Sequence, residues 1–458
     1  MNKRDISSLE GVLGEWFLPN QVKGRIQGVL KQNDNGRIRL HSLDQIDDNG
    51  GLFFGGKNYE IIYGMLSTGP KVTLINSYMN AISHAPGYEE SFFEPTALVV
   101  GGHVPEWNFD VEAIAADFDR IDDWFGVSPF RIGQPENRSE MTVSCKLPYF
   151  QPFEVGDKKI ALLCNMRIKN MSSKDMSLQY SARAEIQFFE PKKITDALEE
   201  LKTLSDFFTL CMGTKCNYRN ISFTYQSNKN NMLLFNNGQQ DIPLKKNLPP
   251  FLISYQHISK QFALCLNTWY IKKDNIAPII DYFVEAHDDS SHQSVVMTFL
   301  KLAQALESFS RKTWGEPNEP KEQYDEKVQR ILEKLSDNAE DQKWIEGMLK
   351  RPGANEPSNN KRFKNILQSV QELLQIQKDN VKKLAYKIVA TRNYYTHFNE
   401  NIKKEIYDNE EIYYVNVIMK ETLRILLLRE LGVSEDVILQ GTQSTGSIND
   451  ACYELHLN

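Results

Sequence analysis

A short polar string late in the chain, Arg392-Asn393-Tyr394-Tyr395-Thr396-His397, contains the residue types needed to hold and cut a phosphodiester. Arginine presents a planar, permanently charged fork to phosphate oxygens, and histidine is the side chain best suited to move protons near neutral pH. No acidic residue lies between Lys382 and His397. The predicted catalytic residues are Arg392, Asn393 and His397, and the predicted substrate contacts are Lys383, Lys387 and Tyr394.

The spacing of apolar residues predicts that a helix over Lys378–Tyr395 positions these groups. Its predicted core face contains Val381, Leu384, Ala385, Ile388, Val389 and Tyr395. If the helix continues, Asn393 and His397 lie on one face, one turn apart. Arg392 and His397 are then about 140° apart around the axis and do not converge on one phosphate. Either the helix bends near Thr396, or a second copy of the chain completes the site.

The string resembles the motif of HEPN domains, in which Arg-Asn-x-x-x-His occurs late in a small helical domain. The earlier segment Phe299–Lys312, with Ala305-Leu306-Glu307, is also similar to HEPN domains, which often place Ala-Leu-Glu before the motif helix. Near the N-terminus, Gly14-Glu15-Trp16-Phe17-Leu18-Pro19 followed by Gly24–Leu30 resembles the ApeA class of anti-phage proteins. In that class a β-rich domain precedes a HEPN domain, so the resemblance covers most of the chain.

The resemblance implies a toxic, metal-independent endoribonuclease of abortive infection, usually a homodimer or higher homo-oligomer, acting on RNA, with tRNA as a family-level expectation. The ribose 2′-hydroxyl would attack the neighbouring phosphorus, with His397 as general base or acid and Arg392 stabilising charge. Asn393 would orient His397 or the phosphate, and Tyr394 would stack on a base. Glu307 would orient Arg392, or instead pair with Arg311 four residues on.

Two other interpretations remain open. The helical part would be a HEPN domain that binds RNA or nucleotides, or only dimerises, without cleavage. Alternatively, the N-terminal part would be a ligand-binding module, for a carbohydrate or a phage protein, and the helical part its signalling partner. In the favoured reading the N-terminal region senses a phage-derived trigger or restrains the nuclease.

The composition is that of a globular protein: 458 residues, 41% hydrophobic, a formal net charge of -7 and a pI near 5.8. An acidic chain is not a general polyanion binder, so contact with RNA must come from a local basic patch. The six cysteines have no CxxC spacing, and no metal or cofactor is expected. The first twenty residues lack a signal peptide's apolar core, and no stretch has the roughly 20 apolar residues of a membrane span. These observations predict a cytoplasmic protein.

The fold class predicted is α+β multidomain, with a β-rich, sandwich-like N-terminal region followed by an all-α, HEPN-like domain. Short alternating segments with Gly, Asn and Asp turns indicate the strands, including a hairpin around Asn33-Asp34-Asn35-Gly36. One helix is expected within this region, over Asp110–Phe125, and another over Ile194–Met212. The predicted domains are 1–190 (sensor or regulatory), 191–250 (mixed helix and strand) and 251–458 (helical nuclease). Helices 321–350 form an insertion-like pair of unassigned role.

Overall fold

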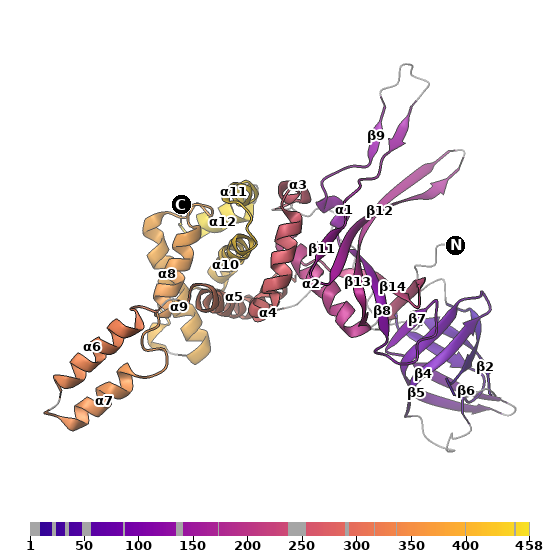
Figure 1. Cartoon of the computed structure of the whole chain (residues 1–458), viewed down its shortest axis with the longest axis horizontal. Coiled ribbons are helices and arrows are strands. Elements are labelled where there is room, and N and C mark those ends of the chain that lie inside the picture. The colour runs from indigo at the N-terminus through magenta and orange to yellow at the C-terminus, as the bar shows by residue number, and fades with distance from the viewer. Residues whose placement is uncertain are drawn as a thin grey trace. The chain divides into compact units, whose positions relative to one another are not determined.

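The computed structural model divides into two compact units, one formed by Met1–Phe208 with Cys216–Leu248 and the other by Thr209–Lys215 with Pro249–Asn458. All described strands belong to the first unit, and the second is helical (Figure 1). The predicted turn at 33–35 and most of the predicted boundary around 240–255 lie outside the described residues. Those described are 10–20, 24–32, 36–47, 56–85, 88–133, 141–172, 174–236, 253–288, 293–315, 317–335, 337–398, 400–443 and 446–457.

The first unit is built almost entirely from antiparallel strands. They are β1 (Leu13–Phe17), β2 (Ile26–Gln32), β3 (Ile38–Ser42), β4 (Lys57–Leu66), β5 (Lys71–Ala85), β6 (Tyr88–Glu94), β7 (Ala97–Val100), β8 (Asp110–Phe118), β9 (Phe130–Ile132), β10 (Val143–Cys145), β11 (Phe153–Val155), β12 (Lys158–Met171), β13 (Met176–Lys193), β14 (Tyr218–Tyr225) and β15 (Asn228–Phe235). Two helices join them, α1 (Ile121–Trp124) and α2 (Ile194–Met212).

Six of these strands close into a ring in the order β5-β4-β1-β2-β3-β6, with β6 pairing back onto β5. Alternate residues point inward, and the interior is filled by apolar side chains such as Trp16, Ile62, Leu74 and Phe93. Position 64 requires glycine, because the Trp16 ring occupies the space that a Cβ would need. The ring is therefore a packed core and not a channel.

The ladder continues from β5 through β7, β15, β14, β8, β13 and β12 to β11. The helix α2 begins directly after β13 and buries a stripe that includes Ile194, Leu201 and Phe208. The Phe208 ring packs edge-on against Phe118 of β8 and Trp124 of α1. The predicted helix over 194–212 is thus confirmed, with an apolar face on the sheet.

The predicted order of a β-rich region followed by a helical one is confirmed. Within the β-rich region, thirteen of the described strands form a ring and its continuation, and β9 and β10 form a separate two-stranded sheet, where a sandwich was expected. The helix predicted over Asp110–Phe125 is wrong, because 110–118 is the strand β8 between β13 and β14. Both faces of β8 are covered, so its apolar residues follow no strict alternation and mimic a helical pattern.

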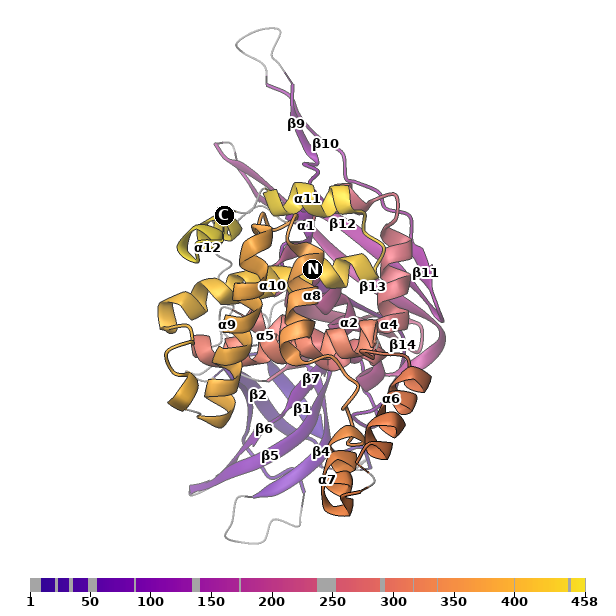
Figure 2. The same cartoon turned by 90° about the vertical axis from the view of Figure 1, so that its left-hand side faces the viewer.

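The helical unit contains ten α-helices among the described residues (Figure 2). They are α3 (Tyr255–Ile258), α4 (Phe262–Ala286), α5 (Val295–Phe309), α6 (Lys321–Glu333), α7 (Ala339–Leu349), α8 (Asn359–Val370), α9 (Lys378–His397), α10 (Asn409–Glu430), α11 (Glu435–Gln443) and α12 (Gly446–Glu454). A π-helical segment, η2 (Ser310–Trp314), extends α5, and a 3₁₀ segment, η3 (Glu400–Ile402), follows α9.

The helix α10 forms the centre of this unit, since it is buried around most of its circumference and packs against α4, α5, α8 and α12. Its start is fixed by a capping box in which Asp408 accepts from the N–H of Glu411 and Glu411 accepts from the N–H of Asp408. The two helices expected over 258–270 and 276–286 are mostly one helix, α4, which continues through Pro278. The predicted pair over 321–350 is the hairpin α6–α7, which extends away from the other helices of the unit (Figure 1).

Candidate active site

The polar string Arg392–His397 occupies the last turn and a half of α9, which remains helical to His397. The buried face of α9 contains Val381, Leu384, Ala385, Ile388, Val389, Ala390 and Thr391. It packs against α5 and α8. Tyr395, predicted to be a core residue, is only half-buried. The packed face fixes α9 while the polar string remains accessible: Arg392, Asn393 and Tyr394 are half-buried and His397 is exposed.

Arg392 is held between two side chains on different helices. Its guanidinium donates from Nη1 to Oδ1 of Asn393 at 3.2 Å and forms an ion pair from Nη2 to Oε2 of Glu307, at 3.6 Å. Glu307 lies on α5 and is only 8% exposed. A carboxylate this well buried needs charged or hydrogen-bonding partners, and Arg392 supplies one of them. The two elements that resemble HEPN domains therefore meet at this pair.

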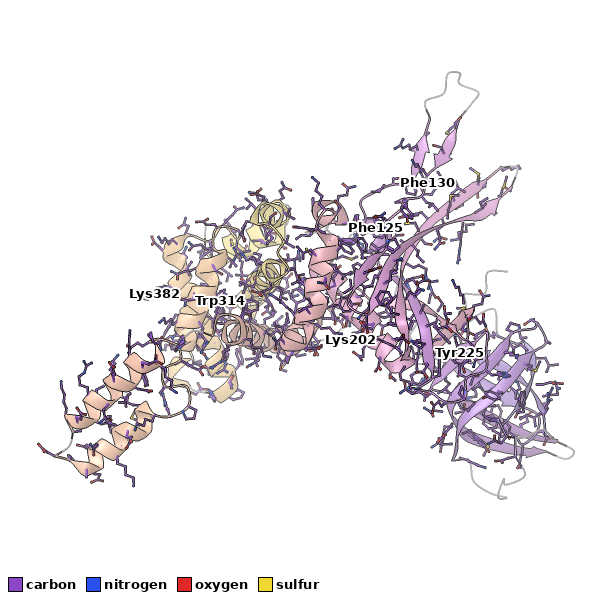
Figure 3. All side chains as sticks on the ribbon, viewed as in Figure 1. Phe125, Phe130, Lys202, Tyr225, Trp314 and Lys382 are labelled. Atoms are coloured by element: carbon purple, nitrogen blue, oxygen red, sulfur yellow. The ribbon has the colours of Figure 1, made fainter. Side chains whose placement is uncertain are left out.

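Glu307 pairs with Arg311 as well, so the two alternatives posed by the sequence occur together. Its Oε1 accepts from Nε and Nη2 of Arg311, each at 3.2 Å. Arg311 belongs to η2, and π-helical turns occur frequently at functional sites. In Figure 3 the two elements can be found by the labelled residues Trp314, at the end of η2, and Lys382, on α9.

Three residues near the start of α8 extend this network, and no sequence pattern indicated them. Nδ2 of Asn359 donates to Oε2 of Glu307 at 3.4 Å. Glu356 is paired with Arg311, and at 2.7 Å with Nη2 of Arg362, which is buried. The result is a chain of three arginines and two carboxylates, and Arg392, the first residue of the polar string, is one end of it. These partners are brought together only by the packing of α5, α8 and α9.

The predicted substrate contacts differ in their availability. Lys387 forms an ion pair with Glu411 at 2.7 Å and lies over the Tyr407 ring at 4.2 Å, so its charge is already engaged. Lys383 is exposed, as is its neighbour Lys382. Tyr394 packs edge-on against Tyr395 and Phe398. Exposed lysines therefore lie near the start of α9, and a cluster of accessible rings lies at its end.

Of the two alternatives that would bring Arg392 and His397 together, a bend near Thr396 is not found. Oγ1 of Thr396 donates to the carbonyl of Arg392, and the N–H of Phe398 donates to the carbonyl of Tyr394. The helix ends at His397, and the next residue, Phe398, takes a left-handed conformation with a φ of 50°. Because α9 is continuous, Arg392 and His397 stay on different faces. Within one α9, the two side chains do not point toward the same phosphate.

No group of three or more His, Cys, Asp or Glu side chains suited to a metal ion occurs among the described residues. The segment 287–292, which has a histidine at each end, is described only to Asp288. His287 is buried, and its Nδ1 donates to the carbonyl of Phe283 at 2.7 Å. The six cysteines are free thiols, four of them buried. Among the described helices, none is both long and apolar enough to cross a membrane.

A helical unit whose motif helix carries Arg-Asn-x-x-x-His beside a buried Glu, preceded in the chain by a β-rich unit, defines a HEPN-type protein. The Apea-like HEPN family matches residues 300–437, which span α5 to the start of α11. The ApeA N-terminal domain 1 family matches residues 11–269, more than half of the chain. The chain therefore belongs to the ApeA family.

No curated protein and no protein of solved structure matches the chain. The family assignment places the chain in an anti-phage group of HEPN nucleases. HEPN domains are generally ribonucleases, and they commonly bind RNA and dimerise.

Proposed function

We propose that the chain is an endoribonuclease of anti-phage defence that cleaves RNA without a metal, at a site centred on Arg392, Asn393 and His397. The observation that supports this most is the fixed Arg392, held by Glu307 and Asn393, one to two turns from an exposed histidine. A pre-oriented guanidinium costs little reorganisation when charge develops on a phosphate. Lys383 and Tyr394 then serve as substrate contacts.

The chemistry is an internal transesterification. The ribose 2′ oxygen bonds to phosphorus, the bond to the 5′ oxygen breaks, and the products are a 2′,3′-cyclic phosphate and a 5′-hydroxyl. One group removes the 2′ proton and another protonates the leaving 5′ oxygen, and His397 takes one of these roles. Arg392 stabilises the added negative charge of the pentacovalent phosphate. Only RNA is cut, because DNA lacks the 2′-hydroxyl.

We also propose that two copies of the chain share each site. A straight α9 separates Arg392 from His397 around its axis, so a second copy is the simplest source of the missing group. The β-rich unit would restrain the nuclease until a phage-derived signal appears. Activation would then destroy host RNA, with tRNA as the first substrate to examine, in the cytoplasm of the infected cell.

The test is RNA cleavage in infected and uninfected cells that express the parent, His397→Asn or His456→Asn. His456 is also exposed in the helical unit, and it has a positive φ that asparagine tolerates. We expect infection-dependent fragments with 2′,3′-cyclic phosphate ends in the parent and the His456 variant. In the His397 variant the fragments fall by about 100-fold or more. Equal cleavage in both variants would refute the site, and RNA binding without cleavage would favour a scaffold.

A further inference from the structure

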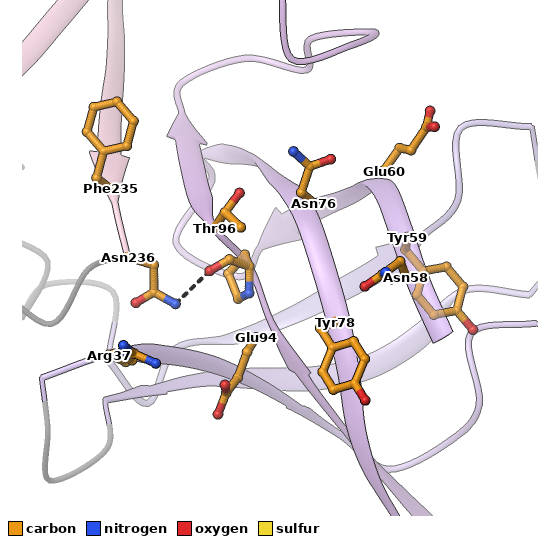
Figure 4. Close-up of a pocket in the computed structure, with 11 residues that line it drawn as sticks. Arg37, Asn58, Tyr59, Glu60, Asn76, Tyr78, Glu94, Thr96, Phe235 and Asn236 are labelled. Atoms are coloured by element: carbon orange, nitrogen blue, oxygen red, sulfur yellow. Dashed lines mark hydrogen bonds between the residues drawn. The ribbon is translucent and has the colours of Figure 1, made fainter. Parts of the chain in front are cut away.

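The β-rich unit carries a cavity on the outside of its six-stranded ring, and one of its lining residues, Tyr59, belongs to the apolar core. Its volume is about 580 Å³, within the range of small-molecule sites, roughly 300–1,000 Å³. Exposed residues of β4 and β5 form one side, and the connection from β6 to β7 forms another (Figure 4). The end of β15, at Phe235, supplies a third wall.

One wall of this cavity is held rigid by the side chain of Asn236. Its Oδ1 accepts from the N–H of Ile38 at 2.5 Å, and its Nδ2 donates to the carbonyls of Ile38 and Pro95 at 2.8 and 2.7 Å. This one amide ties β3, β15 and the β6–β7 connection together. The cavity is therefore formed before any ligand arrives, which lowers the cost of binding.

A second feature of the cavity is the backbone of Asn76, which has a φ of 46°. At this residue β5 exchanges its partner, from β7 (Ile75 opposite Ala97) to β6 (Tyr78 opposite Glu94). The exchange splits the sheet locally and opens the space that Thr96 and Asn76 border. Unusual backbone conformations of this kind cluster at ligand sites.

The lining combines exposed rings with uncharged polar groups. Phe235 and Tyr78 are 40% and 45% exposed, and Phe235 is braced edge-on by Trp107. The amides of Asn58 and Asn76 both donate and accept hydrogen bonds, as does the Tyr78 hydroxyl. Such a surface suits a ligand with apolar faces and many polar edges.

The lining has no surplus of positive charge. Glu94 is neutralised by Arg39, whose Nε donates to it at 3.0 Å, and the other two charged side chains of the lining, Arg37 and Glu60, have opposite signs. A phosphate-bearing ligand would meet carboxylates without a surplus of cations, and so is disfavoured. Carboxylates accept hydrogen bonds only, so the ligand must supply donors. Hydroxyl groups supply both donors and acceptors.

We propose that this cavity binds a neutral, hydroxyl-rich ligand: a short glycan whose sugar faces lie on Phe235 and Tyr78. The amides of Asn58 and Asn76 and the Glu60 carboxylate bind its hydroxyl groups. Barrel surfaces bind oligosaccharides in other β folds. This site does not depend on the ribonuclease proposal, because every residue in it belongs to the β-rich unit.

The test is saturation-transfer NMR on the full chain with maltotriose, cellotriose, mannotriose, N,N′-diacetylchitobiose, and adenosine as a neutral comparison. We expect saturable binding of at least one glycan. Binding should weaken about tenfold or more in Phe235→Ala and Tyr78→Ala, as is usual for central aromatic contacts. Asn76→Gly should weaken it too while easing the backbone, since glycine favours a positive φ. The matched controls Phe189→Ala and Tyr149→Ala, 56% and 82% exposed in the same unit, should bind as the parent does.

Two results would overturn the proposal. One is a folded parent that shows no saturable binding to any of the four glycans, or that binds only adenosine. The other is glycan binding that Phe235→Ala, Tyr78→Ala and Asn76→Gly leave unchanged, with melting temperatures showing that these variants are folded.

Discussion

At the scale of single residues, the position of Arg392 depends on Glu307. The carboxylate is almost fully buried and is shared by Arg392, Arg311 and Asn359. Glu307→Gln keeps the volume and removes the charge. We expect RNA cleavage to fall about tenfold or more, because Arg392 loses its ionic partner. The free energy of unfolding should fall by about 1–3 kcal/mol, since charged hydrogen bonds are lost from a buried group.

The control for this change is Glu346→Gln. Glu346 pairs with Lys350 four residues on, and both are exposed. Pairs of this kind contribute little, so cleavage and stability should match the parent within about 0.5 kcal/mol. Chemical denaturation and the cellular cleavage assay measure both quantities. Unchanged cleavage in Glu307→Gln would mean that Glu307 only braces Arg311.

The string could be proposed as a site from sequence alone, because its residues are adjacent and their types suit phosphodiester chemistry. The ion pair of Glu307 with Arg392 was one of two alternatives, since α5 had no fixed distance from α9 in the sequence. Asn359 and Glu356 were missed entirely. Their contribution depends on how the start of α8 packs against α5, which no local pattern encodes.

At the scale of elements, the turn after α2 depends on a glycine. Gly213 has a φ of 70°, and the Arg424 guanidinium of α10 fills the place where its Cβ would lie. Gly213→Ala should therefore lower the free energy of unfolding by about 2 kcal/mol or more, from backbone strain and overpacking together. The matched change is Gly347→Ala in α7, where a Cβ meets nothing within 4 Å. That change should raise stability by about 0.5–1 kcal/mol. Equal effects of the two substitutions in urea denaturation would contradict this account.

The end of α4 should make the protein sensitive to acid. Burial, with the nearby charge of Lys420, lowers the pKa of His287 to about 3, against about 6.5 in an unfolded chain. Below pH 6.5 the unfolded chain therefore binds a proton that the folded chain does not. Stability falls by up to about 1.4 kcal/mol per pH unit between pH 6.5 and 3. In His287→Gln, the free energy of unfolding should depend less steeply on pH, by the contribution of up to one bound proton. Chemical denaturation between pH 4 and 6 measures this dependence, and the same slope in the variant and the parent would contradict the prediction.

Element types were predictable where one face is solvated, as in the first half of α2 and in α9, because the apolar period is then clear. The strand β8 was misread because its two faces are both covered and its buried residues run together. The ring of six strands and the cavity at Asn76 come from pairings between distant segments. The register of these strands and the closure of the ring cannot be read from a local sequence pattern.

At the scale of the whole molecule, an acidic chain of net charge -7 must confine its contact with RNA to a small region. The last turns of α9 offer one, because Arg392, Tyr394 and the exposed His397 lie there. Two copies that place their α9 ends together would bring Arg392 of one copy toward His397 of the other. A site shared between two copies therefore needs no bend in α9.

The most direct measurement is the coexpression of Arg392→Ala and His397→Asn, with differently tagged copies to confirm mixed pairs in infected cells. Each variant alone should leave RNA intact. A mixed pair contains one site with both groups unchanged, so coexpression should restore roughly a quarter of the parent's cleavage when copies pair at random. Mixed pairs that leave RNA intact would contradict a site shared between two copies.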